Sequence, residues 1–444
     1  MLRGMREHPV RAILRIFFRR VVTIYFRDIE IVGDVPDRDT RGRLLAGNHM
    51  NGLVDPMLVM TSTPCVVSPV AKSTLWNIPG LKWLLDAAHA VPIVRRRDDP
   101  NKSAKDNDAV FERVAKHLRN DGNILIFPEG TSHNEPHLVA LKSGAGRMIA
   151  RARAEGGRKL TVQTVALEFD ARDIFRSRVL VVFGQVRSVD ELGKDGEALA
   201  SAIMERIRLD LEDLLVEAPT WDDRLLIARI AAMFARENRI ESLEEEYAIG
   251  RRVRQAERIL RTGEPATLVK LRNAVSDYHR DLEKVGVTDE VVRLGILRPS
   301  PRRVVRGLFM LATAPLALLG TIAFYVPYLF PRLVTRRLKG DPDEASTYKI
   351  GVGLVVYPVW VAILSGLAFT LLPQPCAWAS LAVLVVCPFV ALPWLDRLDR
   401  LRAKLAAILP GRARAALPAL AMKRRALMAI LEEVRARVEP EPEP

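Results

Sequence analysis

The stretch Ala46-Gly47-Asn48-His49-Met50-Asn51-Gly52-Leu53-Val54-Asp55-Pro56 combines features of a strand end with features of a helix start. It continues the apolar run Leu44-Leu45-Ala46, which is typical of a buried strand. Aspartate is a good N-cap and proline is favoured at the first helical position, so we expect a helix to begin at Asp55-Pro56. His49 would then lie in the turn, within reach of the Asp55 carboxylate. A histidine oriented by a carboxylate is a common general base for hydroxyl groups, although a His and an Asp in one loop are structural more often than catalytic.

Short β-like runs and helical patterns alternate between residues 30 and 190. The helical pattern from Asp108 to Asn120 has one apolar face and ends before Gly122. The run Asn123–Phe127 is nearly all apolar, as expected of a strand buried on both faces. This alternation predicts an α/β fold, a mixed sheet flanked by helices, with functional residues in loops at strand ends. The expected strands are Arg43–Gly47, Cys65–Ser68, Ala90–Val94, Asn123–Phe127, Leu160–Phe169 and Arg178–Gly184.

A second distinctive stretch, Phe127-Pro128-Glu129-Gly130-Thr131-Ser132, follows the fourth expected strand. Glycine lets a backbone approach a ligand closely, and the exposed N–H groups of such a loop bind anions or a developing oxyanion. Together with Asn48, His49 and Asp55, this stretch resembles the glycerolipid acyltransferase family, which includes glycerol-3-phosphate and lysophosphatidate acyltransferases. The separation of His49 and Asp55 is one residue longer than in most members. It resembles the branch that includes the fungal-type glycerol-3-phosphate/dihydroxyacetone-phosphate acyltransferases and bacterial relatives.

The resemblance implies a role for each residue of the two blocks. His49 would take the proton from an acceptor hydroxyl group, which then attacks an acyl thioester. Asp55 would fix the imidazole tautomer and stabilise the imidazolium that forms, and no covalent enzyme intermediate is needed. Glu129 would order the loop and the acceptor rather than act as the base. The remaining residues of these blocks, expected to bind substrate, are Asn48, Gly130, Thr131 and Ser132.

Basic residues near this region are candidates for binding a substrate phosphate. The segment Ala90–Asp98 resembles a family strand that ends in a phosphate-binding arginine, and Arg95 occupies that position with Arg96 next to it. A planar guanidinium matches a phosphate through two parallel hydrogen bonds, whereas the simpler interpretation of an arginine run is a solvated loop. Lys142 precedes a helix expected over Ser143–Glu155 and would add positive charge near the N-terminus of that helix.

Two other combinations of residues in this region indicate different chemistry. Ser132 beside His133 suggests a hydrolytic pair, but residues adjacent in sequence rarely form one. His133 and His137 suggest a metal site, but no acidic or cysteine ligand accompanies them. We therefore expect neither a hydrolase nor a metal, and no cofactor other than acyl-CoA or an acyl carrier protein as co-substrate.

The chain of 444 residues has a formal net charge of +14 and a pI near 9.9, which indicates anionic partners. No spacing typical of a nucleic-acid module is present. The basic residues flank apolar segments, so membrane lipids and substrate phosphates are the expected partners. The cysteines lack metal-site spacing and are expected to be reduced: Cys65, Cys376 and Cys387.

The longest uncharged segment, Ile350–Leu395, has room for two membrane spans, expected at 350–372 and 376–395 around Pro373-Gln374-Pro375. Arginines and lysines flank both ends of this segment, which predicts that both ends lie on the cytoplasmic side of a bacterial inner membrane. A further stretch, Gly307–Pro331, is also basic at both ends. We expect it to be re-entrant or interfacial, with a cytoplasmic active site, and three full crossings are the alternative.

Five regions are therefore expected along the chain. Residues 1–30 form a basic amphipathic helix that lies either in the membrane interface or on its own domain. Residues 31–190 form the α/β acyltransferase domain, 191–300 a helical extension, 301–396 the membrane region, and 397–444 a basic amphipathic helix with a disordered tail. Within the extension, helices are expected at Asp222–Arg236, Ser242–Arg261 and Ala266–Lys284.

These features lead to a functional prediction. The protein would transfer a fatty acyl group from acyl-CoA or an acyl carrier protein to a hydroxyl group of glycerol-3-phosphate or 1-acyl-glycerol-3-phosphate, in phospholipid synthesis. One alternative is an acyltransferase that remodels another lysophospholipid. Another is a non-catalytic membrane protein that binds lipid or acts as a scaffold. The acceptor, the donor and the acylated position stay open.

Overall fold

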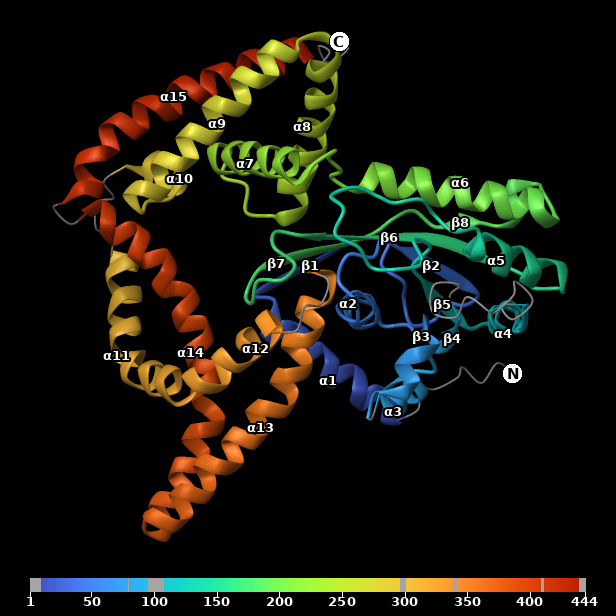
Figure 1. The fold of residues 1–444 in the computed structure, drawn as a ribbon, viewed down its shortest axis with the longest axis horizontal. Helices are drawn as coiled ribbons and strands as arrows, with labels where there is room; N and C mark the ends of the chain where they lie inside the picture. Colours follow the sequence, from blue (N-terminus) through green and yellow to red (C-terminus); the bar gives the residue numbers. More distant parts are fainter. Residues whose placement is uncertain are drawn as a thin grey trace. The chain divides into compact units, whose positions relative to one another are not determined.

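The computed structural model describes residues 9–78, 80–94, 108–295, 301–337, 342–408 and 411–438 (Figure 1). Contacts divide the chain into two compact units. The first consists of Met1–Trp221 together with Gly340–Thr347, and the second of Asp222–Lys339 together with Tyr348–Pro444. A short segment from the C-terminal half of the chain therefore belongs to the first unit.

An eight-stranded sheet forms the centre of the described part of the first unit, in the order β1-β7-β6-β2-β5-β3-β4, with β8 paired to β6. Strand β6 runs antiparallel to β7 and β8, and the other pairs are parallel. The predicted mixed sheet is thereby confirmed. The strands are β1 (Asp28–Gly33), β2 (Arg43–Gly47), β3 (Val67–Lys72), β4 (Val91–Ile93), β5 (Asn123–Ile126), β6 (Thr161–Phe169), β7 (Arg178–Phe183) and β8 (Arg187–Ser188).

The expected strands are all found, but two strands of the sheet were not predicted. Strand β1 alternates acidic with apolar residues and lies at the edge of the sheet, where its residues are exposed or only half-buried. Strand β8 has only two residues. The third strand also begins later than expected, at Val67 rather than Cys65. Edge strands and very short strands lack the continuous apolar run that identifies a buried strand.

Helices pack around this sheet, and several of them contact one another. Helix α5 contacts both α4 and α6, and α6 lies along β6 (Figure 1). Although α6 was expected within the helical extension, it belongs to the first unit. The helices of this unit are α1 (Pro9–Tyr25), α2 (Val54–Ser62), α3 (Leu81–Ala87), α4 (Asp108–Arg119), α5 (Gly144–Ala154) and α6 (Gly196–Leu214), with the 3-10 turns η1 (Ser73–Asn77), η3 (Asp190–Leu192) and η4 (Pro342–Glu344).

The predicted start of α2 is wrong. The helix begins at Val54 with Leu53 as its N-cap residue, so Asp55 lies inside the first turn. The Asp55 carboxylate does not cap this helix, because it accepts hydrogen bonds from the backbone of the preceding turn, at Met50 and Asn51. The same aspartate therefore orders the turn before the helix instead of the helix itself.

Helix α1 packs on its own unit, which is one of the two alternatives that the sequence left open for it. Leu14, Val22 and Tyr25 are buried, and the helix packs on α2. Other apolar side chains of this helix are exposed, since Ile13 is 65% exposed and Phe17 is 43% exposed. The helix thus packs on its own unit through one face and leaves apolar side chains exposed on another. The arginines at positions 3 and 6 lie outside the described residues.

The second unit contains a bundle built from α7 (Trp221–Glu237), α8 (Leu243–Gly263), α9 (Pro265–Val285), α10 (Asp289–Leu294) and α15 (Arg412–Val438). The first three helices match the expected segments closely. Helix α15 packs on α8, α9 and α10 through a buried apolar face, so it is part of the bundle core rather than an isolated amphipathic helix. Residues 439–444, expected to be disordered, lie outside the described residues.

An ionic network holds α15 in this bundle. Arg424 is 6% exposed, and its guanidinium donates to Asp289 Oδ1 (2.9 Å) and to Glu237 Oε2 (2.8 Å). Asp289 Oδ1 also accepts a hydrogen bond from the Tyr278 hydroxyl (2.8 Å). Burial and the adjacent Asp289 carboxylate raise the pKa of Tyr278 well above its usual range. A buried charge with several partners of this kind stabilises one arrangement of the helices.

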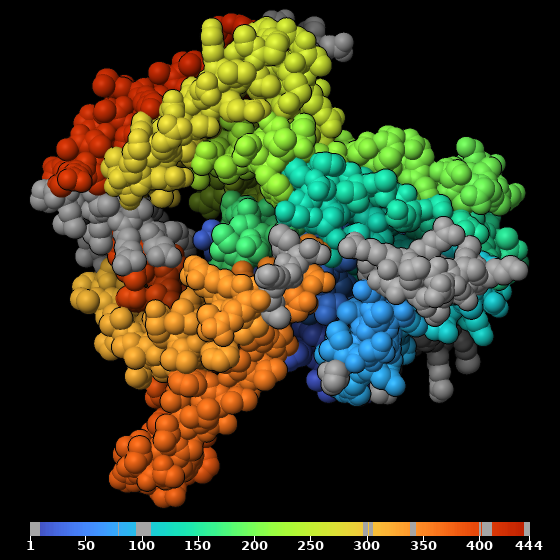
Figure 2. Space-filling view, viewed as in Figure 1, coloured from blue at the N-terminus to red at the C-terminus, as the bar shows by residue number. Residues whose placement is uncertain are grey.

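Among the described residues, three helices are long and apolar enough to cross a membrane, by length and composition: Val305–Ala323, Ala345–Leu371 and Gln374–Leu398. They belong to α11 (Pro301–Ala323), α13 (Ala345–Leu371) and α14 (Gln374–Ile408), and α12 (Tyr325–Arg337) follows α11. Helix α11 continues through Pro315 and ends at Ala323, and Phe324 forms a turn before α12. The hairpin of α13 and α14 is the orange arm in Figure 2, and its exposed apolar side chains include Val355, Ile363, Leu371, Trp378 and Phe389.

The close contact between α5 and α6 provides a test of the packing in the first unit. A Cβ atom on Gly146 would overlap the backbone carbonyl of Ala200, whereas one on Gly144 would lie 3.9 Å from the Phe111 ring. We expect Gly146→Ala to lower the free energy of unfolding by about 1–3 kcal/mol through overpacking. Gly144→Ala on the same helix is the control and should leave the free energy of unfolding unchanged or slightly raised. Thermal unfolding followed by circular dichroism measures both, and equal melting temperatures would contradict the close packing.

Candidate active site

The site forms where three neighbouring strands end. Strands β5, β2 and β6 are adjacent and parallel, so their carboxyl ends meet at one edge of the sheet. His49 follows β2, Glu129 follows β5 and Arg172 follows β6. Loops at the carboxyl ends of parallel strands are the usual place for functional residues in α/β folds.

His49 and Asp55 form a hydrogen-bonded pair. His49 Nδ1 lies 2.9 Å from Asp55 Oδ2, and the Asp55 side chain is fully buried. The same Asp55 oxygen accepts the backbone N–H groups of Met50 (2.8 Å) and Asn51 (2.7 Å). A carboxylate only accepts hydrogen bonds, so it selects the tautomer with the proton on Nδ1 and leaves Nε2 as an acceptor. Within the described part of the chain, no hydrogen-bond partner occupies Nε2.

Two further contacts fix the position of His49. Its ring stacks on Phe127, with the ring centroids 4.2 Å apart and the planes inclined by 17°. Its backbone N–H donates to Glu129 Oε1 (2.7 Å). The imidazole is therefore held on its face, at its Nδ1 edge and at its backbone. Its side chain remains 13% exposed.

Glu129 connects the two sequence blocks. It is 2% exposed, and its second carboxylate oxygen contacts His133 Nε2. His133 Nδ1 accepts the backbone N–H of Glu135 (3.1 Å), so the proton on His133 lies on Nε2 and is donated to Glu129. Glu129 orders both loops, and His133 is occupied by these contacts rather than paired with Ser132. No group of three metal-ligating side chains occurs among the residues that the structure describes.

The loop after β5 has the conformation that its glycine predicts. Gly130 has a φ of +79°, in the left-handed region that favours glycine, and its N–H donates to the Phe127 carbonyl (3.0 Å). The Lys142 N–H donates to the Pro128 carbonyl (2.7 Å), which brings Lys142 beside this loop, just before the start of α5. Thr131 and Ser132 are half-buried in the same loop. Their roles in substrate binding stay predictions.

Asn48 is occupied by the protein itself. It is 2% exposed, its amide donates to the Leu167 carbonyl (3.0 Å), and its Oδ1 accepts the Leu167 N–H (2.7 Å). This side chain therefore ties the turn to β6 instead of facing a ligand. Arg95 and Arg96, the predicted phosphate-binding arginines, lie outside the described residues.

Arg172 is a residue of this site that the sequence analysis missed. Arg172 is 8% exposed. Its guanidinium donates to the carbonyls of Met50 (2.9 Å) and His133 (2.9 Å) and also contacts Asn134 Oδ1. Burial lowers the pKa of Arg172, and the neighbouring carboxylates of Asp343 and Asp55 act in the opposite direction. A signal for it was present, because Arg172 follows β6 as His49 follows β2.

The first turn of α13 also reaches this site. Thr347 Oγ1 accepts the Leu53 N–H (3.0 Å), and the Ser346 hydroxyl donates to the Arg172 carbonyl (2.7 Å). The Tyr25 hydroxyl donates to Ser346 Oγ (3.0 Å), and burial raises the pKa of Tyr25 to about 12. The partners of the Leu53–Thr347 and Tyr25–Ser346 hydrogen bonds lie about 300 positions apart in the chain, so no local sequence pattern indicates these contacts.

Comparisons with known proteins find sequences and one solved structure that are similar to this chain. Residues 28–168 match the family model described as Acyltransferase. The chain is 27% identical to Glycerol-3-phosphate O-acyltransferase 2 of Saccharomyces cerevisiae over 57% of its length and 37% of the relative. It is 28% identical to Lyso-ornithine lipid O-acyltransferase of Pseudomonas aeruginosa over 32% of its length and 48% of the relative. The crystal structure of the 1-acyl-sn-glycerophosphate (LPA) acyltransferase PlsC from Thermotoga maritima aligns with a TM-score of 0.34 and 17% identity, over 46% of this chain and 79% of that chain.

The α/β part of the chain is therefore an acyltransferase domain. Its match to the Acyltransferase model agrees with the resemblance to glycerolipid acyltransferases that the two sequence blocks indicated, and the yeast relative supports the resemblance to the fungal-type branch. The alignments span less than half the length of these curated relatives.

The contact between Thr347 and the turn after His49 can be tested directly. Thr347→Val leaves the Leu53 N–H without its acceptor, so we expect the amides of residues 50–54 to exchange with deuterium roughly fivefold faster, because a net hydrogen bond contributes about 1 kcal/mol. Thr347→Ser keeps the hydroxyl and should exchange like the unmodified protein. Mass spectrometry of the peptide that covers the turn measures both, and identical exchange in the two variants would contradict the contact.

Proposed function

We propose that this protein is an O-acyltransferase that moves a fatty acyl group from acyl-CoA, or an acyl carrier protein, to a hydroxyl group of glycerol-3-phosphate or 1-acyl-glycerol-3-phosphate. The observation that carries the proposal is the His49–Asp55 pair. The His49 Nε2 atom has no hydrogen-bond partner among the described residues. The pair lies within the residues that match the Acyltransferase family model. An imidazole in this state is suited to accept a proton from a hydroxyl group.

The proposed reaction proceeds in two steps. His49 Nε2 takes the proton of the acceptor hydroxyl while the hydroxyl oxygen attacks the thioester carbonyl carbon, and a tetrahedral oxyanion forms. Asp55 stabilises the imidazolium through Nδ1. When the C–S bond breaks, the imidazolium returns its proton to the leaving sulfur, so the products are an ester and a free thiol. The protein itself forms no covalent bond with the acyl group.

Nearby groups would bind the anionic parts of the substrates. Gly130 presents backbone in a left-handed conformation, and Thr131, Ser132 and Lys142 lie in or beside the same loop. Backbone N–H groups of such loops and lysine ammonium groups both attract phosphate or a developing oxyanion. Arg95 and Arg96 are proposed to bind the acceptor phosphate on the basis of their place after β4. Glu129 and Arg172 would keep the loops in position.

A second acceptor class is supported by one relative. The Pseudomonas relative is named for lyso-ornithine lipid, whereas the yeast relative is named for glycerol-3-phosphate. Acylation of another lysolipid is therefore the alternative function, and the same His49 chemistry would serve it. Thiol release with each acceptor offered separately distinguishes the two.

The contacts of Thr347 support a location of the site at the membrane surface. Thr347 lies in the first turn of α13, a helix apolar enough to cross a membrane, and it binds the turn that contains His49. Hydrogen-bonded groups lie on the same side of a membrane, so the chain between residues 301 and 347 would return to the side from which it entered. We propose that α11 and α12 are re-entrant and that α13 and α14 cross a bacterial inner membrane as a hairpin. The active site would lie on the cytoplasmic side of this membrane.

Thiol release from acyl-CoA tests the proposed reaction. Membranes that contain the protein are offered glycerol-3-phosphate, lysophosphatidate or lyso-ornithine lipid separately. We expect release with one of the first two acceptors and a loss of about 10²–10⁴-fold in His49→Ala, because the general base is removed. Asp55→Asn should lose activity to a similar degree, since the asparagine no longer fixes the tautomer.

His137→Ala, at an exposed histidine of the same unit, is the matched control and should retain activity. Release with lyso-ornithine lipid alone would favour the alternative function. Release without any acceptor would indicate a hydrolase. No release with any acceptor or with a carrier-protein donor would contradict the enzymatic proposal in favour of a scaffold.

Cysteine labelling tests the proposed topology. Cys376 is exposed at the start of α14, next to the α13–α14 turn, whereas Cys65 and Cys387 are buried. A membrane-impermeant maleimide added to intact cells should label Cys376, and Cys376→Ser should abolish this label. Lys194→Cys, at an exposed position of the first unit, should be labelled in the Cys376→Ser background only after permeabilisation. Labelling of both positions from the same side would instead indicate three full crossings.

A further inference from the structure

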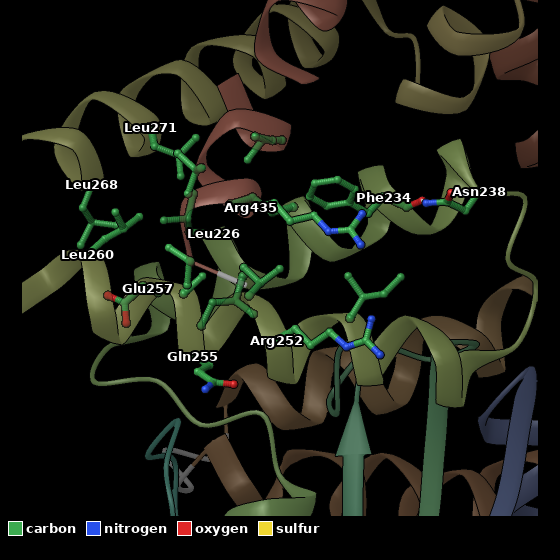
Figure 3. Close-up of a pocket in the computed structure, with 18 of the residues that line it drawn as sticks. Leu226, Phe234, Asn238, Arg252, Gln255, Glu257, Leu260, Leu268, Leu271 and Arg435 are labelled. Atoms are coloured by element: carbon green, nitrogen blue, oxygen red, sulfur yellow. The ribbon is translucent and has the colours of Figure 1, made fainter. Parts of the chain in front are cut away.

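The helical bundle of the second unit contains a cavity of about 480 Å³ (Figure 3). Its inner wall is formed by side chains of the bundle core: Leu226, Ile230, Phe234, Leu260, Leu268, Leu271, Leu431 and Val434. Protein interiors are close-packed and have few voids larger than a water molecule, whereas a volume of this size is typical of small-molecule sites. The cavity lies on α7, α8, α9 and α15, and none of the candidate active-site residues lines it.

Two arginine side chains lie at one end of the cavity, whereas Glu257 lies near Leu260 toward the other end (Figure 3). In Figure 3 the guanidinium groups of Arg252 and Arg435 lie on the side of Asn238, away from the leucines of α8 and α9. These three residues are exposed, whereas the apolar wall is buried. The cavity therefore has an apolar interior and a positively charged, solvent-accessible end.

Two acidic side chains near the cavity form ion pairs within their own helices. Glu257, the acidic residue among the lining side chains, is 4% exposed and forms an ion pair with Arg261. Glu432 lies 3.7 Å from Arg435 as an exposed pair on the same helix, and such pairs are weak and easily exchanged. An anionic group at this end of the cavity would meet two guanidinium groups from different helices, Arg252 on α8 and Arg435 on α15.

We propose that this cavity binds one long-chain fatty carboxylate. The alkyl chain would lie among the buried leucines, and the carboxylate would lie between Arg252 and Arg435. A methylene group fills roughly the volume of a water molecule in the liquid, about 30 Å³. A cavity of about 480 Å³ thus has room for a chain of roughly fifteen carbons. This site is separate from the proposed acyl transfer and does not depend on it.

Photolabelling of the full-length protein tests the proposal. The protein in phosphatidylcholine nanodiscs is exposed to palmitate that carries a diazirine near the end of its chain, and labelled peptides are identified by mass spectrometry. We expect labels in residues 226–271 and 431–438, competed by palmitate but not by the neutral monopalmitoylglycerol. Arg252→Glu and Arg435→Glu should each reduce this labelling about tenfold, because a charge-assisted hydrogen bond is replaced by repulsion. Arg258→Glu, exposed on α8 but outside the lining, should label normally.

A cavity-filling variant provides the second arm. Ala256 lines the cavity, so Ala256→Trp should abolish labelling of the bundle, with an unchanged or raised melting temperature showing that the protein is folded. The arginine variants change exposed residues and guard against a failure of this variant to fold. Absence of label in the bundle, undiminished label in a folded Ala256→Trp protein, or equal competition by monopalmitoylglycerol would overturn the proposal. Stronger competition by lysophosphatidate than by palmitate would overturn the assignment of the carboxylate.

Discussion

The turn between β2 and α2 closes around the Asp55 carboxylate, which is fully buried and accepts hydrogen bonds from Met50, Asn51 and His49. A buried charge is costly unless it is hydrogen-bonded and compensated. Two backbone N–H groups and an imidazole supply the hydrogen bonds. The positively charged guanidinium of Arg172 also interacts electrostatically with the Asp55 carboxylate. One side chain thereby determines both the shape of the turn and the orientation of the His49 ring.

The rest of the first unit supports this turn from several directions. Asn48 binds the turn to β6, Glu129 binds its backbone from the loop after β5, and Thr347 binds Leu53 from the start of α13. The supports come from segments far apart in the chain, and each is a hydrogen bond to backbone or to His49 itself. Such a turn loses little freedom when a substrate binds, which is the condition for efficient proton transfer at a fixed position.

The second unit uses a related device for a different purpose. Arg424 and Asp289 are buried and paired, and they connect α15 to α7, α9 and α10. A buried ion pair contributes more to the choice of one arrangement than to the free energy of unfolding. It holds a C-terminal helix in the bundle, and that helix supplies one wall of the cavity. The cavity therefore exists only because residues 412–438 return to helices that precede the membrane segments.

Local sequence patterns determined the α/β character, the buried strands, the helices at 222–284 and the pairing of His49 with Asp55. Each of these depends on residues close together in the chain or on runs long enough to show a period. The edge strand β1 was missed because its short run pairs with the distant strand β7. The start of α2 was misplaced because the Asp55 carboxylate binds the preceding turn instead of capping the helix. Contacts between residues distant in sequence also decide the places of Arg172, Ser346 and Thr347 at the site and the lining of the bundle cavity. Tertiary structure alone brought these groups together, since a hydrogen bond between residues about 300 positions apart leaves no periodic trace in the chain.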